Sequence, residues 1–554
     1  MDIAVKHEVK YFAPPAESIP PVTARATTWL TQALLLVASM AASGVASVLL
    51  GQDANWDLQN YHFYNAWAFL NDRLGWDYAP AQLQSFLNPV IEVPFYWMIA
   101  TDWPPRLVAF VMGLPGGVGA FFLAKILLRI FGKLPPKQRW LYVMLAFIVG
   151  ICASGPVSLL GSTMNEWQGA SLVMAALWVL LSHRRNAGPT PWRAIAGAGL
   201  LCGIASGLKL TAATYAVGLC AALLLQPPVL WRGFREAAGF GVATMLGVLA
   251  TLGPWMWALY EHFGNPLFPY FNEFFRSPWW DQAPLLSRTF GPHSVIEWLT
   301  FPLRMLHVER SFVTEGSFRD WRLPILYLAF IAGVIGWLIE RMRGGRARTA
   351  TGDSVLEWKL ITVFWCVSFV IWTAVYSIYR YLVPLELLSG ALIIQLLRWS
   401  VPIRWLALAT TMATAAAVFT VHYPDWGRIP YGRHYFQINA PPIAPHAVVL
   451  MINDEPMAYV LPFFPSDGRF LSVKSNFNSP QRRNRFEYEI ARIVREHDGP
   501  LYSLSFPAVP EPQVLDAHGL RIASSGCAKV ITNMPTSPLE LCRLERTPAD
   551  DARR

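Results

Sequence analysis

The chain has 554 residues, of which 54% are hydrophobic and 15% are charged, with a formal net charge of +9. A soluble protein carries about a quarter charged residues, so this composition predicts a membrane protein. The basic residues gather in short segments between apolar runs, without a Gly-rich phosphate loop or zinc-finger spacing, so the positive charge does not indicate a nucleic-acid partner.

Apolar stretches with the length and composition of membrane spans recur along the chain, about eleven in a window of roughly nineteen residues. The N-terminal residues are polar up to Ala26, so the first stretch reads as a retained anchor and not as a cleaved signal peptide. We therefore expect a cytoplasmic N-terminal segment over residues 1–27 and an all-α polytopic membrane domain over residues 28–421. The expected spans cover approximately residues 28–50, 107–131, 140–160, 168–182, 194–209, 211–229, 238–257, 323–340, 359–377, 384–398 and 404–421.

Every second connection between these spans is short and rich in Lys or Arg, as the positive-inside rule requires of cytoplasmic loops. The pattern predicts a cytoplasmic N-terminus and a C-terminal tail outside, which in a bacterial inner membrane means the periplasm. The basic residues concerned are Lys6, Lys10, Arg25, Lys133, Lys137, Arg139, Arg184, Arg185, Arg193, Arg232, Arg235, Arg341, Arg343, Arg346, Arg348, Lys359, Arg398 and Arg404.

The connections on the opposite side are longer, and long loops of this kind usually carry function. The first covers residues 51–106 and contains an aromatic, helix-compatible stretch from Leu58 to Leu70. A second apolar stretch, Phe86 to Ala100, is interrupted by two prolines and is too short and too broken to span the membrane. We expect these two stretches to form a pair of interfacial helices.

Asp57 is the candidate catalytic group of this first loop, because it lies a few residues beyond the expected membrane edge. A carboxylate held at the lipid surface suits chemistry on a lipid-linked substrate, whereas a solvated loop acid is the alternative. Asp53 lies one helical turn earlier and is a rival candidate.

Residues 422–554 have the patterning of a separate periplasmic domain. Residues 446–452 and 501–506 look like buried strands, and residues 485–497 have the apolar spacing of an amphipathic helix. Alternating strand and helix predicts a small α/β domain. Cys527 and Cys542 are the two cysteines of this tail, and we expect a disulfide between them, with two buried thiols as the alternative.

The order of short motifs along residues 28–400 resembles the GT-C superfamily of integral-membrane glycosyltransferases. The likeness is greatest to the protein-mannosyltransferase and aminoarabinose-transferase branch, which takes a sugar from a polyprenyl-phosphate carrier. Where the family often has a second acid after the first-loop Asp, this chain has Leu58. The matching segments are Asp57 with Tyr61, Asn88-Pro89 through Pro94-Phe95-Tyr96-Trp97, Arg106, Asn165-Glu166, the small-residue span ending at Lys209, Gly253-Pro254-Trp255, Gly264-Asn265-Pro266 and Tyr379-Arg380-Tyr381.

This resemblance implies displacement at the anomeric carbon of a polyprenyl-phosphate sugar, in which the acceptor hydroxyl loses a proton and the phosphate gains charge. Asp57 matches the position of the general base. Lys209, Arg380 and Arg106 match positions from which cations would bind the donor phosphate. The alternative for each of these cations is a side chain that only anchors a span end at the interface.

Glu166 could orient the acceptor, or bind a divalent cation together with Asp57. Two carboxylates supply few oxygen ligands for a metal, so the presence of a metal stays unknown. Other candidates for the substrate pocket are Asp53, Tyr61, His62, Tyr64, Asn165 and Tyr381, and the alternative for the aromatic ones is the belt at the membrane interface.

The expected partners are thus the lipid bilayer, a polyprenyl-phosphate sugar donor, and a glycan, lipid or protein acceptor. A transporter or flippase for a lipid-linked saccharide is the alternative from another class, and a polymerase or ligase of lipid-linked glycans is a third. Transporters tend to carry charges near the membrane midplane in repeated broken helices, whereas the charges here gather at one face.

Overall fold

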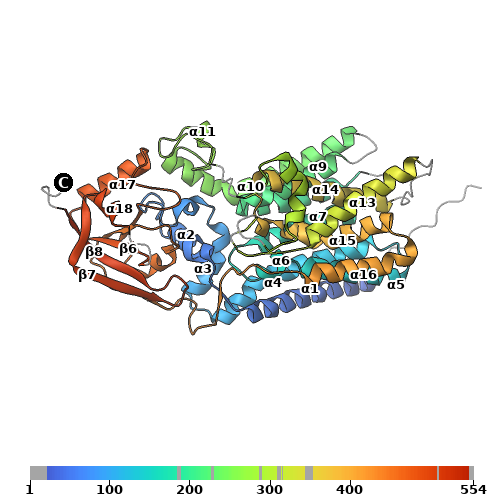
Figure 1. Ribbon diagram of the computed structural model, residues 1–554, viewed down its shortest axis with the longest axis horizontal. Coiled ribbons are helices and arrows are strands. Elements are labelled where there is room, and N and C mark those ends of the chain that lie inside the picture. Colours follow the sequence, from blue (N-terminus) through green and yellow to red (C-terminus); the bar gives the residue numbers. More distant parts are fainter. Residues whose placement is uncertain are drawn as a thin grey trace, which may run out of the picture.

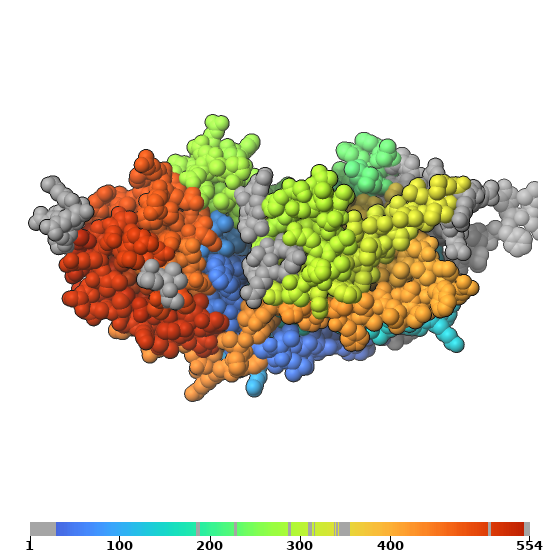
Figure 2. All heavy atoms as spheres, viewed as in Figure 1, coloured from blue at the N-terminus to red at the C-terminus, as the bar shows by residue number. Residues whose placement is uncertain are grey.

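The computed structural model describes residues 22–183, 189–225, 230–285, 290–308, 313–314, 316–342, 353–507 and 511–547. The expected N-terminal segment up to residue 21, and the basic residues at 184–185 and 343–348, lie outside the described residues. Helices fill one end of an elongated molecule and a sheet domain forms the other, with the first loop between them (Figures 1 and 2).

Each expected span overlaps a helix over much of its length. Prolines at the first or second helical position begin several of them, where the missing N–H would have no partner in any case. The helices are α1 (Val22–Leu50), α4 (Pro105–Ile130), α5 (Pro136–Ile151), α7 (Glu166–His183), α8 (Trp192–Leu208), α9 (Ala213–Leu224), α10 (Leu230–Phe263), α13 (Arg322–Met342), α14 (Asp353–Val375), α15 (Val383–Ser400) and α16 (Ile403–Phe419).

By length and composition, five helices within the described ranges can cross a membrane. They cover Trp29–Leu50, Pro105–Ile130, Leu230–Phe263, Val355–Val375 and Tyr379–Ser400. Shorter apolar helices cover Val90–Ala100, Trp192–Leu208, Leu210–Leu224, Arg322–Gly336 and Ile403–Phe419. The chain is therefore a multi-pass membrane protein, whereas eleven crossings remain an expectation.

The expected span over residues 140–160 is shorter than its apolar sequence indicates. α5 ends at Ile151, and the separate short helix α6 (Ser154–Ser158) follows it. The break brings backbone donors to buried acids: the Ser154 N–H donates to Asp320 at 3.2 Å and the Gly155 N–H to Glu386 at 3.3 Å. Hydropathy could not predict this break, because the acids come from distant parts of the chain.

Small residues let the helices pack closely, as is common in membrane bundles. α1 lies along α4, where a Cβ added at Gly117 would stand 2.4 Å from the Met40 Cα. α8 lies along α10, where a Cβ added at Gly203 would stand 2.1 Å from the Thr244 carbonyl oxygen. Neither contact has room for a side chain.

The first external loop contains one of the two expected interfacial helices in full. It begins with strand β1 (Gln52–Asp53), followed by the π-helix η1 (Leu58–His62) and α2 (Phe63–Leu70), which together form that helix. The prediction of the second interfacial helix, Phe86 to Ala100, is wrong over its first half, because prolines that lack an N–H interrupt the helix there. It consists of the 3-10 turns η2 (Gln82–Phe86) and η3 (Val90–Glu92) and the helix α3 (Val93–Ala100).

Short elements also lie at the ends of later spans and in the loop after α10. Two are 3-10 turns, η4 (Leu210–Ala212) before α9 and η5 (Tyr379–Leu382) before α15. The loop after α10 forms α11 (Asn272–Phe275) and α12 (Val295–Arg304).

The tail forms an α/β domain whose six-stranded sheet has the order β3-β7-β8-β6-β4-β5. The expected strands appear as β4 (Val448–Met451) and β6 (Leu501–Ser505), and they pair in parallel. The expected helix is α17 (Arg485–Glu496), which Asn484 caps by accepting from the Glu487 N–H. The remaining elements are β2 (Arg428–Ile429), β3 (Ile438–Asn439), η6 (Ala458–Phe463), β5 (Arg469–Ser472), α18 (Pro512–Asp516), β7 (Leu520–Thr532) and β8 (Leu539–Arg546).

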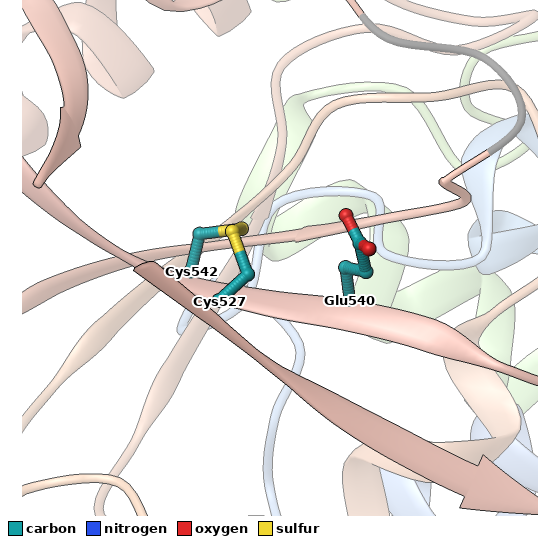
Figure 3. A group of neighbouring side chains, drawn as sticks. All are labelled: Cys527, Glu540 and Cys542. Atoms are coloured by element: carbon teal, nitrogen blue, oxygen red, sulfur yellow. A yellow bond between two sulfur atoms is a disulfide. The ribbon is translucent and has the colours of Figure 1, made fainter. Parts of the chain in front are cut away.

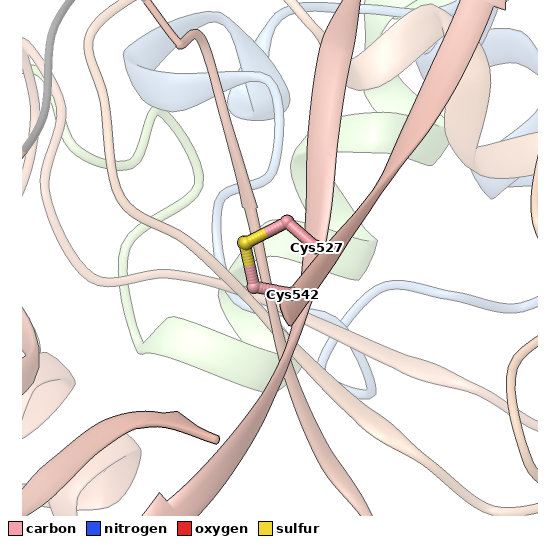
Figure 4. Close-up of a disulfide and its surroundings, with 2 residues drawn as sticks. All are labelled: Cys527 and Cys542. Carbon is pink, nitrogen blue, oxygen red and sulfur yellow. A yellow bond between two sulfur atoms is a disulfide. The ribbon is translucent and has the colours of Figure 1, made fainter. Parts of the chain in front are cut away.

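A disulfide joins Cys527 of β7 to Cys542 of β8, which are directly opposite each other in the antiparallel pair (Figure 4). This covalent bond joins two inner strands of the sheet and has a sequence separation of 15.

The C-terminal domain packs tightly on the first loop. Tyr78 bridges to Leu471, and the Arg73 guanidinium donates to the carbonyls of Ser466 at 2.7 Å and Gly468 at 2.6 Å. β1 of the loop also pairs with β2 of the tail. The first loop is therefore held between the membrane helices and the C-terminal domain.

Candidate active site

Asp57 lies at the start of the π-helix η1, whose residues Leu58–His62 are all buried. π-Helical turns are rare and occur often at functional sites, because they shift side chains out of the regular helical positions. Asp57 is 6% exposed although it follows a polar segment at the end of α1. The carboxylate is therefore held inside the protein and not in a solvated loop.

The Asp57 carboxylate pairs with Arg380 from η5, 323 residues away. One guanidinium nitrogen, Nη1, donates to Asp57 Oδ2 at 2.7 Å, and the Tyr61 hydroxyl lies 3.4 Å from the same oxygen. Burial acts to raise the pKa of Asp57, but the charges of Arg380 and Lys209 outweigh it and lower that pKa below its ordinary value. The ionised form of Asp57 is thus stabilised by a neighbouring, partly buried cation.

A second ion pair lies beside the first. Lys209, at the end of α8, donates to Glu166 at the start of α7, and also to the Met164 carbonyl at 2.5 Å. Arg380 Nε stands 3.9 Å from the other oxygen of Glu166. The two acids and two bases therefore form one cluster at neighbouring helix ends.

Tyr381 lies against both cations of this cluster. The Arg380 guanidinium and the Lys209 ammonium each stand 5.4 Å from the centre of its ring. The Tyr215 hydroxyl donates to the Tyr381 carbonyl. Cation–π attraction and this hydrogen bond fix the turn from which Arg380 extends.

His62 and Glu92 form a buried pair in the same part of the first loop. Nδ1 of His62 stands 2.7 Å from Oε1 of Glu92. Burial lowers the pKa of His62 to about 3 and raises that of Glu92 well above its ordinary value. Burial therefore disfavours the charged form of both partners in this pair.

Several buried polar atoms around this cluster have no hydrogen-bond partner among the described residues. They are Nε2 of His62, Oε2 of Glu92 and Oε1 of Glu166. Buried polar atoms are almost always paired, so a group of unpaired ones in one region indicates a place prepared for a polar ligand.

The structure brings together only part of the predicted set of residues. Asp57, Tyr61, Glu166, Lys209, Arg380 and Tyr381 form one cluster through the contacts above. Asp53 instead accepts hydrogen bonds from Asn55 and from the backbone and hydroxyl of Thr163, each at 2.8 Å, which makes it a structural anchor of the loop.

The remaining predicted residues have other contacts. The Tyr64 hydroxyl donates to Asp77 at 2.7 Å, and the Asn165 amide oxygen accepts from Gln168. Asn165 has a φ of +63°, so its contribution is to the turn before α7. The Arg106 guanidinium stands 5.6 Å from the centre of the Tyr431 ring.

Glu92 was missed by the sequence analysis, although the sequence contains a signal for it. It is an acid within the apolar stretch Phe86–Ala100, and such an acid is costly unless it has a partner. The partner, His62, lies in the other half of the same loop. A search for apolar stretches with one acid could have found Glu92, but not the pairing.

The residues present do not fit a divalent cation. Asp57 and Glu166 already neutralise Arg380 and Lys209, so a metal would have to displace both buried ion pairs. Among the described residues, one group of acid, histidine and cysteine side chains is close enough to share an ion, formed by Cys527, Glu540 and Cys542 (Figure 3). Its two sulfurs are bonded to each other, which removes them as thiolate ligands.

No family model and no curated protein matches this chain. Solved structures similar to it include ArnT from Cupriavidus metallidurans bound to undecaprenyl phosphate, at 11% identity and a TM-score of 0.45, covering 94% of this chain and 98% of ArnT. The arabinofuranosyltransferase AftD from Mycobacteria shares 14% identity at a TM-score of 0.47, covering 93% of this chain and 40% of AftD. The oligosaccharyltransferase of Archaeoglobus fulgidus, in complex with Zn and sulfate, shares 12% identity at a TM-score of 0.38, covering 84% of this chain and 67% of that one. At these TM-scores the likeness carries no argument about activity.

Proposed function

We propose that this chain is a GT-C-type glycosyltransferase of the bacterial inner membrane, transferring a sugar from a polyprenyl-phosphate donor to an acceptor hydroxyl at the periplasmic face. The observation that carries the proposal is the buried cluster of Asp57, Arg380, Glu166 and Lys209 at helix ends, with unpaired polar atoms around it. Such a cluster offers both a base and cations within one site.

In the proposed reaction the acceptor oxygen forms a bond to the anomeric carbon while the bond from that carbon to the phosphate oxygen breaks. Asp57 takes the proton of the acceptor hydroxyl, and the electron pair of the broken bond goes to the phosphate, which leaves with an additional negative charge. Arg380 and Lys209 stabilise that charge, which is largest at the transition state and in the product.

Arg380 has two roles in this scheme. In the free protein it holds Asp57 ionised, and a carboxylate with a low pKa is a weak base. When the donor phosphate engages the guanidinium, the pairing with Asp57 weakens and the carboxylate becomes more basic. Binding of the donor would therefore activate the base.

Replacement of Asp57 by Asn tests the proposal, because it removes the base and keeps the shape of the side chain. We expect a loss of 10²–10⁴-fold in transfer from a polyprenyl-phosphate sugar, with donor binding at least as tight as in the wild type, because Asp57 no longer competes for Arg380. Asp53→Asn is the matched control, and its effect should fall on stability because Asp53 anchors Thr163. Wild-type turnover in Asp57→Asn would refute the assignment of the base.

A wild-type protein that carries the intact saccharide across liposome membranes, without transferring sugar, would instead identify the transporter alternative. Purified protein in liposomes, supplied with a labelled polyprenyl-phosphate sugar and assayed for both outcomes, distinguishes the two classes.

A further inference from the structure

An aromatic cavity of about 340 Å³ lies outside the Asp57 cluster, between the first external loop and the C-terminal domain. Its volume is at the lower end of the range for small-molecule sites, roughly 300–1,000 Å³. Residues from α2 and α3 form one side, and residues from the segment around 434–436 and from η6 form the other. The cavity therefore exists only where the two parts of the chain meet.

The floor of the cavity is a packed set of aromatic rings. The Phe63 ring centre stands 4.8 Å from that of Phe436, 5.5 Å from that of Tyr96 and 6.1 Å from that of Phe463. Phe63 and Phe436 are buried, so their positions are fixed before any ligand arrives. The floor is preformed and offers flat apolar surface.

The mouth of the cavity is polar. Asp102 and His434, 332 residues apart, meet there with 2.7 Å between Oδ1 and Nδ1. Asp102 has a φ of +56°, a conformation uncommon outside glycine, and both side chains remain open to solvent. Trp103 stands beside them with 39% of its surface exposed. Flat rings inside and exposed polar groups at the opening are therefore combined in one site.

We propose that this cavity binds a sugar ring of the acceptor, so that the acceptor of the proposed transferase is a saccharide; this inference rests on the function proposed above. A pyranose has an apolar C–H face that packs on an aromatic ring and a rim of hydroxyls. Here the hydroxyls meet Asp102 and His434 at the mouth. The site suits a neutral sugar, since an acidic one would face the Asp102 carboxylate.

An acyl chain fits this cavity less well. It would cover Asp102 and His434, which contact each other, without offering hydrogen bonds to replace those of the water that it displaces, and removing polar groups from water in this way is unfavourable.

The cavity and Asp57 are linked through one continuous helical segment. Phe63 follows Asp57 by six residues, at the start of α2 directly after η1. Tyr61 contacts Asp57, whereas Phe63 contributes to the cavity floor. The bound ring is therefore not the one that reacts, and binding of a distant unit would hold the reacting hydroxyl near Asp57.

Three variants of the full-length protein test this inference. Trp103→Ala removes an exposed aromatic surface of the cavity, and Asp102→Asn removes the charge at its mouth. Trp97→Ala is the control, because Trp97 is an exposed tryptophan of α3 that does not line the cavity. None of the three contacts the Asp57 cluster, and a thermal melt of each variant verifies folding.

The primary measurement is saturation-transfer NMR with maltotriose, cellotriose and mannotriose as neutral probes, in nanodiscs. We expect saturation of at least one trisaccharide in the wild type and in Trp97→Ala, and a decrease on the order of tenfold in affinity in Trp103→Ala. Asp102→Asn should also weaken the signal. No saturation by any trisaccharide, or equal signals in Trp103→Ala and Trp97→Ala, would overturn the inference, as would displacement of the sugar by a short-chain phospholipid.

A second measurement separates this inference from the proposed function. In transfer assays the Trp103→Ala variant should raise the acceptor KM and leave hydrolysis of the donor by water unchanged. If the wild type shows neither transfer nor donor hydrolysis, the proposed function fails, while the NMR comparison still decides whether the cavity binds sugar. If transfer proceeds with the same acceptor KM in both tryptophan variants, the cavity is not an acceptor site.

Discussion

At the scale of single residues, the pairing of Asp57 with Arg380 determines what the site can do. A buried carboxylate without a partner would be neutral, because burial penalises the charged form. Here the nearby cations keep the pKa of Asp57 low, so the carboxylate is ionised but weakly basic in the free protein. A phosphate that competes for Arg380 would change that balance.

The pH dependence of the reaction follows from this competition. The profile of kcat/KM reports the free protein and that of kcat the donor complex. Because Arg380 lowers the pKa of Asp57 only when paired with it, we expect the acidic limb of kcat/KM to lie at lower pH than that of kcat. Rates measured from about pH 4 to about pH 8, upward from the ordinary pKa of a carboxylate, compare the two limbs. If the acidic limbs of kcat/KM and kcat fall at the same pH, the donor phosphate does not displace Asp57 from Arg380.

The donor phosphate provides a second prediction at this scale. Arg380→Ala and Lys209→Ala should each weaken donor binding by about 1.5–3 kcal/mol, roughly ten- to a hundredfold. Arg380→Lys should recover part of the loss, because an ammonium lacks the planar fork. Titration of each variant with the polyprenyl-phosphate sugar measures this donor affinity.

The control for these variants is Arg106→Ala, since that guanidinium lies over the Tyr431 ring. The effects of Arg380→Ala and Lys209→Ala should be non-additive if both cations contact one phosphate. Unchanged donor affinity in Arg380→Ala would leave the phosphate site unassigned.

At the scale of elements, the short turn η5 must be held in place for Arg380 to reach Asp57. The neighbouring Tyr379 is buried, and its hydroxyl donates to Glu386 and lies 3.1 Å from Asp320. Asp320 in turn pairs with Arg322 at 2.6 Å, and Arg322 donates to carbonyls at the end of α5. This network connects η5 to two spans and positions Arg380.

Tyr379→Phe should therefore affect the donor site from a distance. Removal of the hydroxyl takes one donor from Glu386 and Asp320, which keep their contacts with Gly155, Ser154 and Arg322, so we expect a cost of about 0.5–1.5 kcal/mol in stability. We expect a weaker donor affinity together with a lower melting temperature. Tyr423→Phe is the matched control, because its exposed hydroxyl donates to the Cys152 carbonyl of the same region without contacting η5. If Tyr379→Phe lowers only the melting temperature, η5 does not depend on this network.

At the scale of the whole molecule, the C-terminal domain covers the loop that carries Asp57. The Gln59 side chain of η1 accepts from the Thr536 hydroxyl at 2.8 Å, and Arg73 donates to the Ser466 carbonyl, just before β5. Aromatic and aliphatic residues of both parts share buried cores. The tail and the Asp57 cluster must therefore be in the same compartment.

This packing gives a topological prediction. Reporter fusions within residues 341–358 should be active in the cytoplasm, and fusions within residues 430–550 in the periplasm. The physical reason is the distribution of Lys and Arg over the short connections. A cytoplasmic tail would contradict it, and because the tail contacts the first loop, the active site would then face the cytoplasm as well.

The sequence by itself determined the features that depend on local patterns. Apolar runs of sufficient length indicated the membrane helices, short apolar runs indicated the buried strands β4 and β6, and apolar residues at helical spacing indicated α17. The position of Asp57 just beyond α1 also follows from local hydropathy. The break at α6 was not predicted, since it involves acids from distant parts of the chain.

Only the tertiary structure decided which charges meet. Asp57 could have paired with any of the external cations, and the choice of Arg380 depends on how α1, η5 and α15 pack. The pair of Glu92 with His62 and the cavity between Trp103 and His434 likewise join residues that are far apart in the chain. Local propensity does not encode such contacts, because each is fixed by the packing of many side chains at once, and in a buried site each charge takes the partner that this packing leaves within reach.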